Sequence, residues 1–454
     1  MTAENRIPIL EKVLNNPENY NFDVETLGEC KIASPLTCCA FTTDEDRVLL
    51  TTDAGRLQKY AEQGIKPPSF ERAGASSKLF FDPSWTRAAI VTAGGLCPGL
   101  NDVIKGIVQI MHFEYGVRSI LGIRYGYRGL LPESAVAPIL LTPEIVDTIH
   151  EDGGSILGSS RGSGDRITEI VDTLRREDIN IIFCLGGDGT LRGAGDIADE
   201  IKRRGLSISV VGIPKTIDND LNFVGRSFGF ETAVYQTHSV ITAAHTEAKG
   251  AYNGIGLVKL MGRDSGFIAA YASLANSVAN FCLIPELNFR LDGEGGLLRA
   301  IERRFSISDH CVIVVAEGAG QNLMEQGGEE RDASGNLLKK DIGLFLKNAI
   351  GRYFKEKEKN VPVKYFDPSY SIRSAPAQGT DAILCYLLAK NAVHAAMRGK
   401  TKCVIGNMNG VYSMVPVDLA TVERQEIDLR GDLWRAVMDV TQQSDYFGWS
   451  GYEE

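Results

Sequence analysis

The sequence predicts an α/β fold built from doubly wound, largely parallel sheets, and three observations support this prediction. Short apolar runs that end in glycine alternate with segments of helical periodicity from about residue 88 onward. A second series of such runs begins near residue 254. The chain has 454 residues, of which 44% are hydrophobic and 23% charged, so it is long enough for about three domains of roughly 150 residues each.

The first series contains three expected strands. Residues 88–92 lead into a glycine turn that contains Gly94, and residues 179–185 lead into the sequence GGDGT. Residues 206–212 lead into PKTIDND. Helix-period segments follow the first two turns, and strands joined by helices form parallel sheets. Ligands bind beyond the carboxyl ends of such strands, so the three turns are expected to form one site.

The second series contains expected strands at 254–260, 281–284 and 311–316, and it predicts a second α/β domain. The first 87 residues are mixed in character, and residues 47–52 alternate as one strand of a small appendage would. We therefore expect an N-terminal extension to which the sequence assigns no chemistry.

Charge and cysteine content exclude several classes of function. The 48 Lys and Arg against 58 Asp and Glu give 48 − 58 = −10, which disfavours binding to nucleic acid or to anionic membranes. No apolar run approaches the roughly 18 residues of a membrane span, and the N-terminus does not resemble a signal peptide. Nine cysteines without paired spacing indicate reduced thiols in a cytoplasmic protein, with neither a disulfide framework nor a zinc site.

The GGDGT turn is the first candidate for phosphate chemistry. Gly187, Gly189 and Thr190 would bring backbone N–H groups of a helix N-terminus toward a ligand, and Asp188 could hold a hard cation such as Mg²⁺. A Walker-type P-loop is absent. The same pattern also fits a glycine turn with an aspartate as helix cap.

The PKTIDND segment carries a sharper pattern. Asp218 and Asp220 stand two positions apart after a strand, and Lys215 and Thr216 add a charge and a hydroxyl for a phosphate. The alternative is a turn with solvated acids. The loop around Arg161 and the segment around Arg263 are weaker, and each alone fits an ordinary loop.

Taken together and in order, these segments resemble the phosphofructokinase family. The resemblance rests on GGLCPGLN, GGDGT, PKTIDND, MGRDSG, the glutamate of VVAEGAG and PSYSIRSAP, and it spans about residues 88–410. The segments are most similar to the long clade that holds plant and trypanosomatid ATP-dependent enzymes and many pyrophosphate-dependent ones. This resemblance implies two Rossmann-like domains and an N-terminal extension.

The resemblance also implies a domain division and a reaction. Residues 88–229, with a returning segment at about 376–430, would bind the nucleotide, and residues 230–375, with the C-terminal tail, would bind fructose 6-phosphate. The enzyme would transfer the γ-phosphoryl group of ATP to the 1-hydroxyl of fructose 6-phosphate in glycolysis. Pyrophosphate as donor is the alternative, and a non-catalytic sugar-phosphate-binding subunit is a more remote one. GGDGT alone also occurs in lipid and NAD kinases, but the sugar-phosphate segments argue against that class.

The resemblance assigns roles to individual residues. Asp218 would be the base, Thr216 and Asp220 would place the phosphoryl group, and Lys215 and Arg263 would complete the catalytic set. The glycine-rich segments would bind the nucleotide through Gly94, Arg161, Gly187, Asp188, Gly189 and Thr190. Asp188 would also bind the Mg²⁺ ion.

The expected sugar-phosphate ligands overlap with the catalytic set. They are Thr216, Asp218, Asp220, Met261, Gly262, Arg263, Glu317, Lys364, Tyr370 and Arg373. Short bacterial family members carry an arginine eight residues before the glycine of the MGR segment, but Gly254 stands there in this chain. The 6-phosphate is therefore expected to be bound differently or by another basic residue.

The residue after Asp188 bears on the choice of donor. Gly189 leaves room for the nucleotide α-phosphate, whereas an aspartate there, as in pyrophosphate users, would occupy and repel it. Lys215 instead favours pyrophosphate, because pyrophosphate users in the family carry lysine at this position. The long ATP-using clade, however, combines this glycine with this lysine. We therefore expect ATP with Mg²⁺, and from the resemblance we also expect an allosteric homodimer or homotetramer in the cytoplasm.

Overall fold

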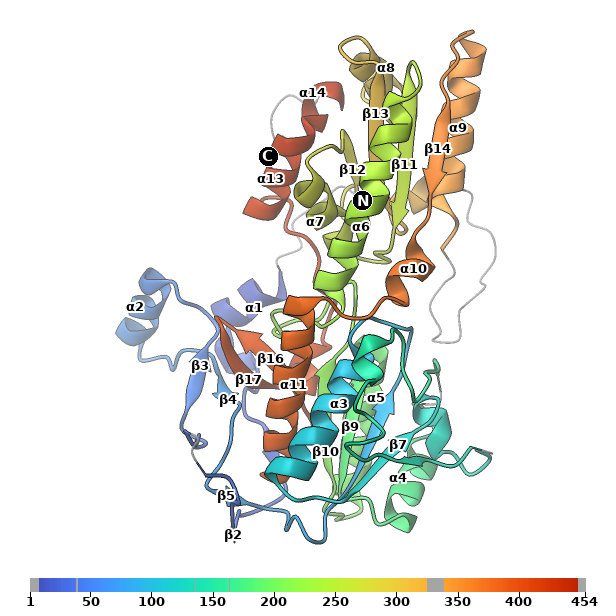
Figure 1. The fold of residues 1–454 in the computed structure, drawn as a ribbon. Coiled ribbons are helices and arrows are strands. Elements are labelled where there is room, and N and C mark those ends of the chain that lie inside the picture. The colour runs from blue at the N-terminus through green and yellow to red at the C-terminus, as the bar shows by residue number, and fades with distance from the viewer. Residues whose placement is uncertain (1–7, 38–39, 135, 163, 325–338, 448–454) are drawn as a thin grey trace.

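Two sheets whose strands are mostly parallel lie one above the other (Figure 1). The computed structural model describes residues 8–37, 40–134, 136–162, 164–324 and 339–447. The predicted α/β class is confirmed by this arrangement. Within the described residues, no helix has the length and apolar character needed to cross a membrane.

The large sheet has nine strands with a parallel centre and antiparallel edges. In spatial order they are β3 (Arg47–Leu49), β4 (Ser69–Arg72), β17 (Val411–Pro416), β16 (Cys403–Met408), β10 (Ser209–Pro214), β9 (Ile181–Gly186), β6 (Arg87–Thr92), β7 (Ser119–Ile123) and β8 (Ile139–Leu140). The strands from β16 to β7 are parallel to one another. The expected strand at 206–212 lies further along the chain, because its buried run continues to Pro214.

Helices cover both faces of the large sheet, as the alternation along its central strands requires. On β6, Ala88 and Ile90 pack on one side with α3 (Leu100–Gln109) and α11 (Gly379–Met397). Ala89 and Val91 pack on the other side with α4 (Ile167–Arg176) and α5 (Asp188–Arg203). This sandwich fixes the carboxyl ends of β6, β9 and β10 relative to one another.

The small sheet is entirely parallel and is also covered on both faces. Its order is β12 (Phe281–Leu283), β13 (His310–Ala316), β11 (Gly254–Leu260) and β14 (Val363–Phe366). One face packs against α6 (Phe230–Lys249) and α7 (Phe267–Asn276), and the other against α8 (Leu297–Phe305) and α9 (Ile342–Glu356). The three predicted strands of the second series are confirmed here.

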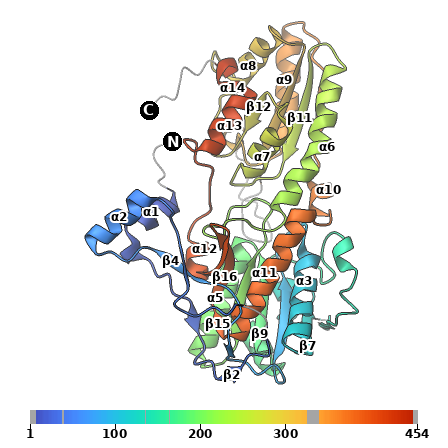
Figure 2. The ribbon, with the colours of Figure 1, turned by 60° about the vertical axis from the view of Figure 1, so that its left-hand side comes forward.

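The N-terminal extension is more closely joined to the rest than we expected. Its strands β3 and β4 extend the large sheet through β17, whereas the sequence suggested a separate appendage. The reason is that β16 and β17 form an antiparallel hairpin that leaves a hydrogen-bonding edge for β4. The helices α1 (Ile9–Asn15) and α2 (Ala54–Gln63) project from this edge (Figure 2).

The remaining elements are short. They are the strand pairs β1 (Glu25–Thr26) with β15 (Lys400–Thr401) and β2 (Ile32–Ala33) with β5 (Lys78–Leu79), the helices α10 (Ser369–Arg373), α12 (Val417–Ala420), α13 (Asp432–Thr441) and α14 (Gln443–Phe447), and the single turns η1 (Pro17–Asn19), η2 (Ile110–Glu114), η3 (Gly126–Leu130), η4 (Ile149–Glu151) and η5 (Gln321–Leu323). Of these, α13 and α14 pack against the helices and strands of the small sheet, and the described part of the chain ends there.

Loops at the carboxyl ends of the two sheets meet between them. The hydroxyl of Ser265, which follows β11, donates to the backbone oxygen of Asp218, which follows β10, at 3.2 Å. The backbone N–H of Gly229, at the start of α6, donates to the buried carboxylate of Asp381 at 3.0 Å, and Asp381 lies in the first turn of α11. The region between the sheets is thus the place where the predicted motifs converge.

Candidate active site

The GGDGT turn joins β9 to α5 and presents the N-terminus of a long helix to the region between the sheets. Thr190 folds back onto the strand end so closely that a Cβ on Gly186 would lie 2.2 Å from the Thr190 Cβ. A Cβ on Gly189 would instead point into open space, with no atom within 4 Å. The first N–H groups of a helix of this length form a natural phosphate site.

Asp188 is the first residue of α5, and its side chain does not cap the helix. The alternative of a capping aspartate is therefore not seen. Its carboxylate instead lies 3.1 Å from Arg192 Nε and 3.9 Å from Arg424 Nε, and the side chain is mostly buried. A carboxylate held in this way at a helix N-terminus can bind a hard cation beside a phosphate.

Lys215 lies beside the glycine turn that follows β6. Its ammonium donates to the backbone oxygen of Gly95 at 2.8 Å, and a Cβ on Gly94, whose φ is +92°, would stand 3.0 Å from the lysine Nζ. Burial lowers the pKa of Lys215. A Cβ on Gly95 would lie 3.6 Å from Arg161, so Arg161 and Lys215 both lie beside the turn that contains Gly94.

The segment after β10 arranges its acids by local hydrogen bonds. The Thr216 hydroxyl donates to Asp220 Oδ1 at 3.1 Å and accepts from the Asp218 N–H at 3.1 Å. Asn219, with φ of +51°, accepts from the Ser227 N–H at 3.0 Å. The asparagine therefore makes the turn, Thr216 holds one oxygen of Asp220, and Asp218 contributes only its backbone N–H to these bonds.

The carboxylate of Asp218 has the most unusual environment in the group. Its Oδ1 is buried and has no hydrogen-bond partner. Burial raises the pKa of Asp218 to about 7, with further increases from the nearby carboxylates of Asp220 and Glu317 and opposing effects of Arg373 and Arg424. Burial also raises the pKa of Asp220. An acid with a pKa close to neutrality and an unpaired oxygen is suited to accept a proton.

Residues from the small sheet face this acid. Glu317 follows β13, and its N–H donates to the oxygen of Leu260 at the end of β11 at 2.9 Å. Gly262 has φ of +122°, and a Cβ there would lie 2.5 Å from the backbone oxygen of Ser265, so only glycine fits this turn. The predicted Met261, Gly262 and Glu317 are thus neighbours on adjacent strand ends, and Arg263 Nε lies 3.9 Å from Asp264.

Of the three predicted 6-phosphate ligands, Arg373 lies near the acid group and Lys364 does not. Arg373 ends α10, and its charge acts on both Asp218 and Lys215. Tyr370 in the same helix is 84% exposed. Lys364 instead lies 3.8 Å from Glu247, near the far end of α6, so its assignment stays a prediction.

Gly254, where short bacterial members carry arginine, begins β11. A Cβ there would meet the backbone oxygen of Ala248 at 2.2 Å. A larger side chain does not fit at this position, so an arginine could not occupy it in this backbone.

Two arginines that contact the acid group were not predicted from the sequence. Arg424 comes from the segment between α12 and α13, and its guanidinium contacts Asp188, Asp220 and Asp264. Arg192 lies one helical turn after Asp188 and pairs with it. The spacing of Arg192 could have indicated this pair. Arg424 is 204 positions from Asp220 and belongs to no motif, so only the fold brings it to the site.

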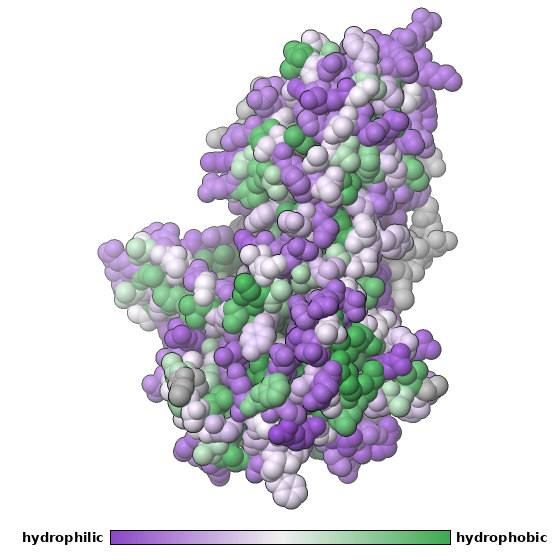
Figure 3. All heavy atoms as spheres, in the orientation of Figure 1, coloured by the Kyte–Doolittle hydropathy of each residue, from purple (hydrophilic) through white to green (hydrophobic). Residues whose placement is uncertain are grey.

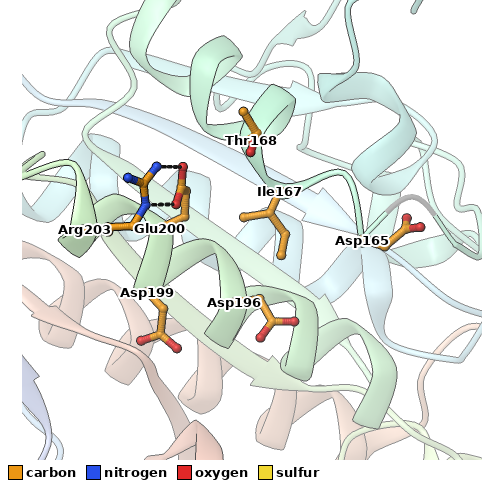
Figure 4. A pocket seen from close by; sticks show the side chains of 7 residues that line it. All are labelled: Asp165, Ile167, Thr168, Asp196, Asp199, Glu200 and Arg203. Carbon is orange, nitrogen blue, oxygen red and sulfur yellow. Dashed lines mark hydrogen bonds and ion pairs between the residues drawn. The ribbon is translucent and has the colours of Figure 1, made fainter.

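A separate hollow lies on the outer side of the large sheet. It is lined by residues of α4 and α5 and by Asp165, two positions before α4, and its side chains are Asp165, Ile167, Thr168, Asp196, Asp199, Glu200 and Arg203 (Figure 4). Arg203 pairs with Glu200 within it, Nε to Oε2 at 2.6 Å. None of the predicted site residues lines this hollow.

Comparison with known proteins identifies a family. The model of the phosphofructokinase family matches residues 87–396. An ATP-dependent 6-phosphofructokinase of Borreliella burgdorferi is 48% identical over 438 residues, which are 94% of this chain and 97% of the relative. An ATP-dependent 6-phosphofructokinase of Trypanosoma brucei brucei is 48% identical over 380 residues, 83% of this chain and 77% of the relative.

A solved structure supports the fold at lower sequence similarity. The pyrophosphate-dependent phosphofructokinase of Marinobacter aquaeolei superposes with a TM-score of 0.64 at 21% identity, covering 79% of this chain and 91% of that one. This similarity concerns the fold alone.

Proposed function

The chain belongs to the phosphofructokinase family and phosphorylates fructose 6-phosphate with ATP, and from this premise we propose that the transfer takes place between Asp188 and Asp218. The relatives that match most of the chain are ATP-dependent enzymes, and the assignment of the reaction rests on this similarity. The open space at Gly189 supports ATP over pyrophosphate, because it leaves room for the rest of the nucleotide. In this proposal the nucleotide binds over residues 88–229 with the returning segment 376–430, and the sugar phosphate binds over residues 230–375.

Asp218 acts as the base. It takes the proton from the 1-hydroxyl of fructose 6-phosphate as that oxygen attacks the terminal phosphorus. The single observation that carries this role is its buried Oδ1 without a partner. Thr216 keeps the neighbouring Asp220 in place, and Lys215 and Arg263 supply positive charge on the two sides.

The acid at the start of α5 fits a magnesium ion. Mg²⁺ is usually bound in proteins by one or two carboxylates, with waters and substrate phosphates completing its shell. Asp188 meets this description, because its mostly buried carboxylate stands at a helix N-terminus where phosphates also bind. When bound, Mg²⁺ supplies charge neutralisation at the phosphoryl oxygens.

The sugar phosphate is bound from the small sheet and α10. Glu317 accepts hydrogen bonds from sugar hydroxyls, while Met261 and Gly262 form the wall beside them. Arg373 and Tyr370 contact the 6-phosphate, and a dianionic phosphate needs several such donors. The charge that Arg373 exerts on Asp218 supports its position next to the base.

Replacing Asp218 by asparagine tests the role of the base. We expect formation of fructose 1,6-bisphosphate to fall by about 10²–10⁴-fold, the range of general-base catalysis. Binding of fructose 6-phosphate, measured by calorimetry, is expected to persist. The matched control is Asp196→Asn on α5, which lines the hollow of Figure 4. Turnover by Asp218→Asn equal to that of the control would refute the assignment.

We further propose that the chain forms a homodimer or homotetramer. Large apolar side chains stand exposed on three helices that pack together, namely Tyr235 on α6, Tyr370 on α10 and Ile383 on α11. Hydrophobic residues also interrupt the hydrophilic surface on the face shown in Figure 3. Light scattering coupled to gel filtration tests this proposal, and a monomer at all concentrations used for activity would contradict it.

A cytoplasmic location is the last part of the proposal. The described cysteines are free, and six of the seven are buried, as expected for thiols in a reducing compartment. Cell fractionation with an antibody against the chain tests this location.

A further inference from the structure

The segment between α12 and α13 crosses from the large sheet to the small one (Figure 2). Its backbone is fixed to both sides. The Gln425 N–H donates to the oxygen of Asp220 at 2.8 Å, and the Ile427 N–H donates to Glu286 Oε1 at 3.0 Å. Glu286 also accepts from the N–H of Gly266 at the start of α7. The residue next to Gln425, Arg424, is therefore carried on a supported backbone.

The guanidinium of Arg424 is surrounded by three carboxylates from three different segments of the chain. Its Nε lies 3.9 Å from Asp188 Oδ2 and 3.8 Å from Asp220 Oδ2, and its Nη1 pairs with Asp264 Oδ2. The side chain is 28% exposed, so it is reachable from the region between the sheets. Arg424 thus joins the end of β9, the end of β10 and the end of β11.

This position adjoins both the proposed metal ligand and the loop of the proposed base. Asp188 marks the magnesium and nucleotide side, and Asp220 stands two residues after the base on the sugar side. The Arg424 Nε lies within 4 Å of both carboxylates and therefore adjoins the proposed metal ligand and the loop of the proposed base. Arginine offers several N–H donors in a planar fork that matches phosphoryl oxygens, and a fixed cation there stabilises the charge of the transition state.

We propose that Arg424 is a further catalytic residue, whose guanidinium binds the phosphoryl group during its transfer. This inference rests on the proposed function. The bond from the sugar 1-oxygen to phosphorus forms, the bond from phosphorus to the β-phosphate oxygen breaks, and the proton goes to Asp218. Arg424 donates hydrogen bonds and gives up no proton. Without substrate, the three carboxylates hold its charge in place.

The opposing explanation is that Arg424 only clasps the two sheets together. Three variants separate the two roles. Arg424→Met removes the guanidinium. Arg424→Lys keeps a positive charge that can pair with the carboxylates but loses the planar array of N–H donors. Arg430→Met is the control, because it removes the same charge from an exposed position of the same segment.

Two measurements are made on each variant. The first is kcat for fructose 1,6-bisphosphate formation, together with the KM for each substrate. The second is the affinity for ADP with Mg²⁺ and fructose 6-phosphate, with and without aluminium fluoride, which mimics a transferring phosphoryl group. The wild type is expected to bind ADP more tightly when aluminium fluoride is present.

For Arg424→Met we expect kcat to fall by about 10²–10³-fold, as when one transition-state donor is lost. Affinity for ADP alone should stay within about threefold, but aluminium fluoride should no longer tighten it, because the guanidinium that would donate hydrogen bonds to the phosphoryl mimic is absent. Arg424→Lys should recover only part of kcat. Unchanged tightening in Arg424→Met, or full kcat in Arg424→Lys, would overturn the proposal. A wild type that forms no fructose 1,6-bisphosphate would instead refute the proposed function.

Discussion

Asp218 shows how one buried side chain links structure to the pH dependence of the reaction. Burial raises its pKa to about 7, and the base works only when it is deprotonated. We therefore expect kcat/KM for fructose 6-phosphate to be constant above neutrality and to fall about tenfold per pH unit below it. Initial rates between pH 5.5 and 9 check this, and a profile without an acid limb near 7 would contradict it.

The same shift has a consequence for stability. A carboxyl group whose pKa is raised on folding favours the folded protein while it is protonated, and this stability is lost as the pH rises through about 7. Asp218→Asn is therefore expected to melt several degrees above the wild type at pH 8. The difference should vanish near pH 4, where both side chains are neutral. Melting curves at the two pH values measure it, with Asp196→Asn as control, and an equal Tm at pH 8 would be the contrary result.

Residues inside motifs were open to prediction, whereas isolated ones were not. Asp188, Asp218 and Glu317 each follow a buried strand, and the ends of parallel strands share one edge of a sheet, so their proximity could be expected from the sequence. Arg424 sits in an irregular segment with polar neighbours. The position of Arg424 at the site depends on the distance in space between α12 and α13, and no local sequence pattern predicts that distance.

At the scale of the element, Lys259 positions the short helix α10. Its ammonium is mostly buried and lies 2.8 Å from Asp367 and 3.2 Å from Asp341. Asp367 in turn accepts from the N–H of Ser369 at the start of α10, which ends in Arg373. Removing the lysine charge should therefore loosen the helix that carries the proposed 6-phosphate ligands.

We expect Lys259→Met to raise the KM for fructose 6-phosphate about tenfold, which corresponds to about 1.4 kcal/mol of binding, while kcat changes little. Lys347→Met on α9 removes the same charge from an exposed position and is the control. Steady-state kinetics at saturating ATP measure both variants. An unchanged KM, or a loss confined to kcat, would show that α10 does not depend on this pair.

The central strands were predictable because both of their faces are buried. β6, β9 and β13 read as continuous apolar runs followed by glycine or acid, which is typical of parallel strands covered by helices. β14 was not predicted, because the four residues Val363–Phe366 lie at the edge of the small sheet, none of them is fully buried, and they form no continuous apolar run. The hairpin of β16 and β17 returns to the large sheet after the whole small sheet has been formed, and such a long-range pairing leaves no local pattern.

At the scale of the whole molecule, a buried ion pair ties the N-terminal extension to the large sheet. Lys400 Nζ lies 2.6 Å from Glu71 Oε2, and the two side chains are only 5% and 6% exposed. Glu71 also accepts from the N–H of Val24 at 3.1 Å. Asp44 reaches the same lysine at 2.8 Å. Lys400 thus holds the segments around Asp44 and Glu71 directly, and the segment around Val24 through Glu71.

Lys400→Met should leave Glu71 as an unpaired buried charge and cost about 3–5 kcal/mol of unfolding free energy. Because β4 is part of the large sheet, we expect one cooperative transition at lower denaturant concentration. Urea unfolding followed by tryptophan fluorescence and by circular dichroism measures this. Two separate transitions would mean that the extension unfolds on its own, as the sequence had suggested.

The role of the extension could not be read from its own residues. The alternation at residues 47–52 predicted the strand β3, but its place in the large sheet depends on the pairing of β4 with β17, more than 300 positions away. In contrast, the convergence of the motifs between two sheets could be predicted from the sequence, because these motifs follow expected strands.

The choice of phosphoryl donor is tested by the reaction itself. Formation of fructose 1,6-bisphosphate from fructose 6-phosphate and Mg²⁺ is followed with ATP or with pyrophosphate, in the wild type and in Gly189→Asp. The Cβ of residue 189 would enter open space, so the variant should fold normally while its carboxylate occupies and repels the nucleotide phosphate. We predict turnover with ATP in the wild type and its loss in Gly189→Asp. Turnover of the wild type with pyrophosphate alone, or full ATP turnover in the variant, would contradict the account.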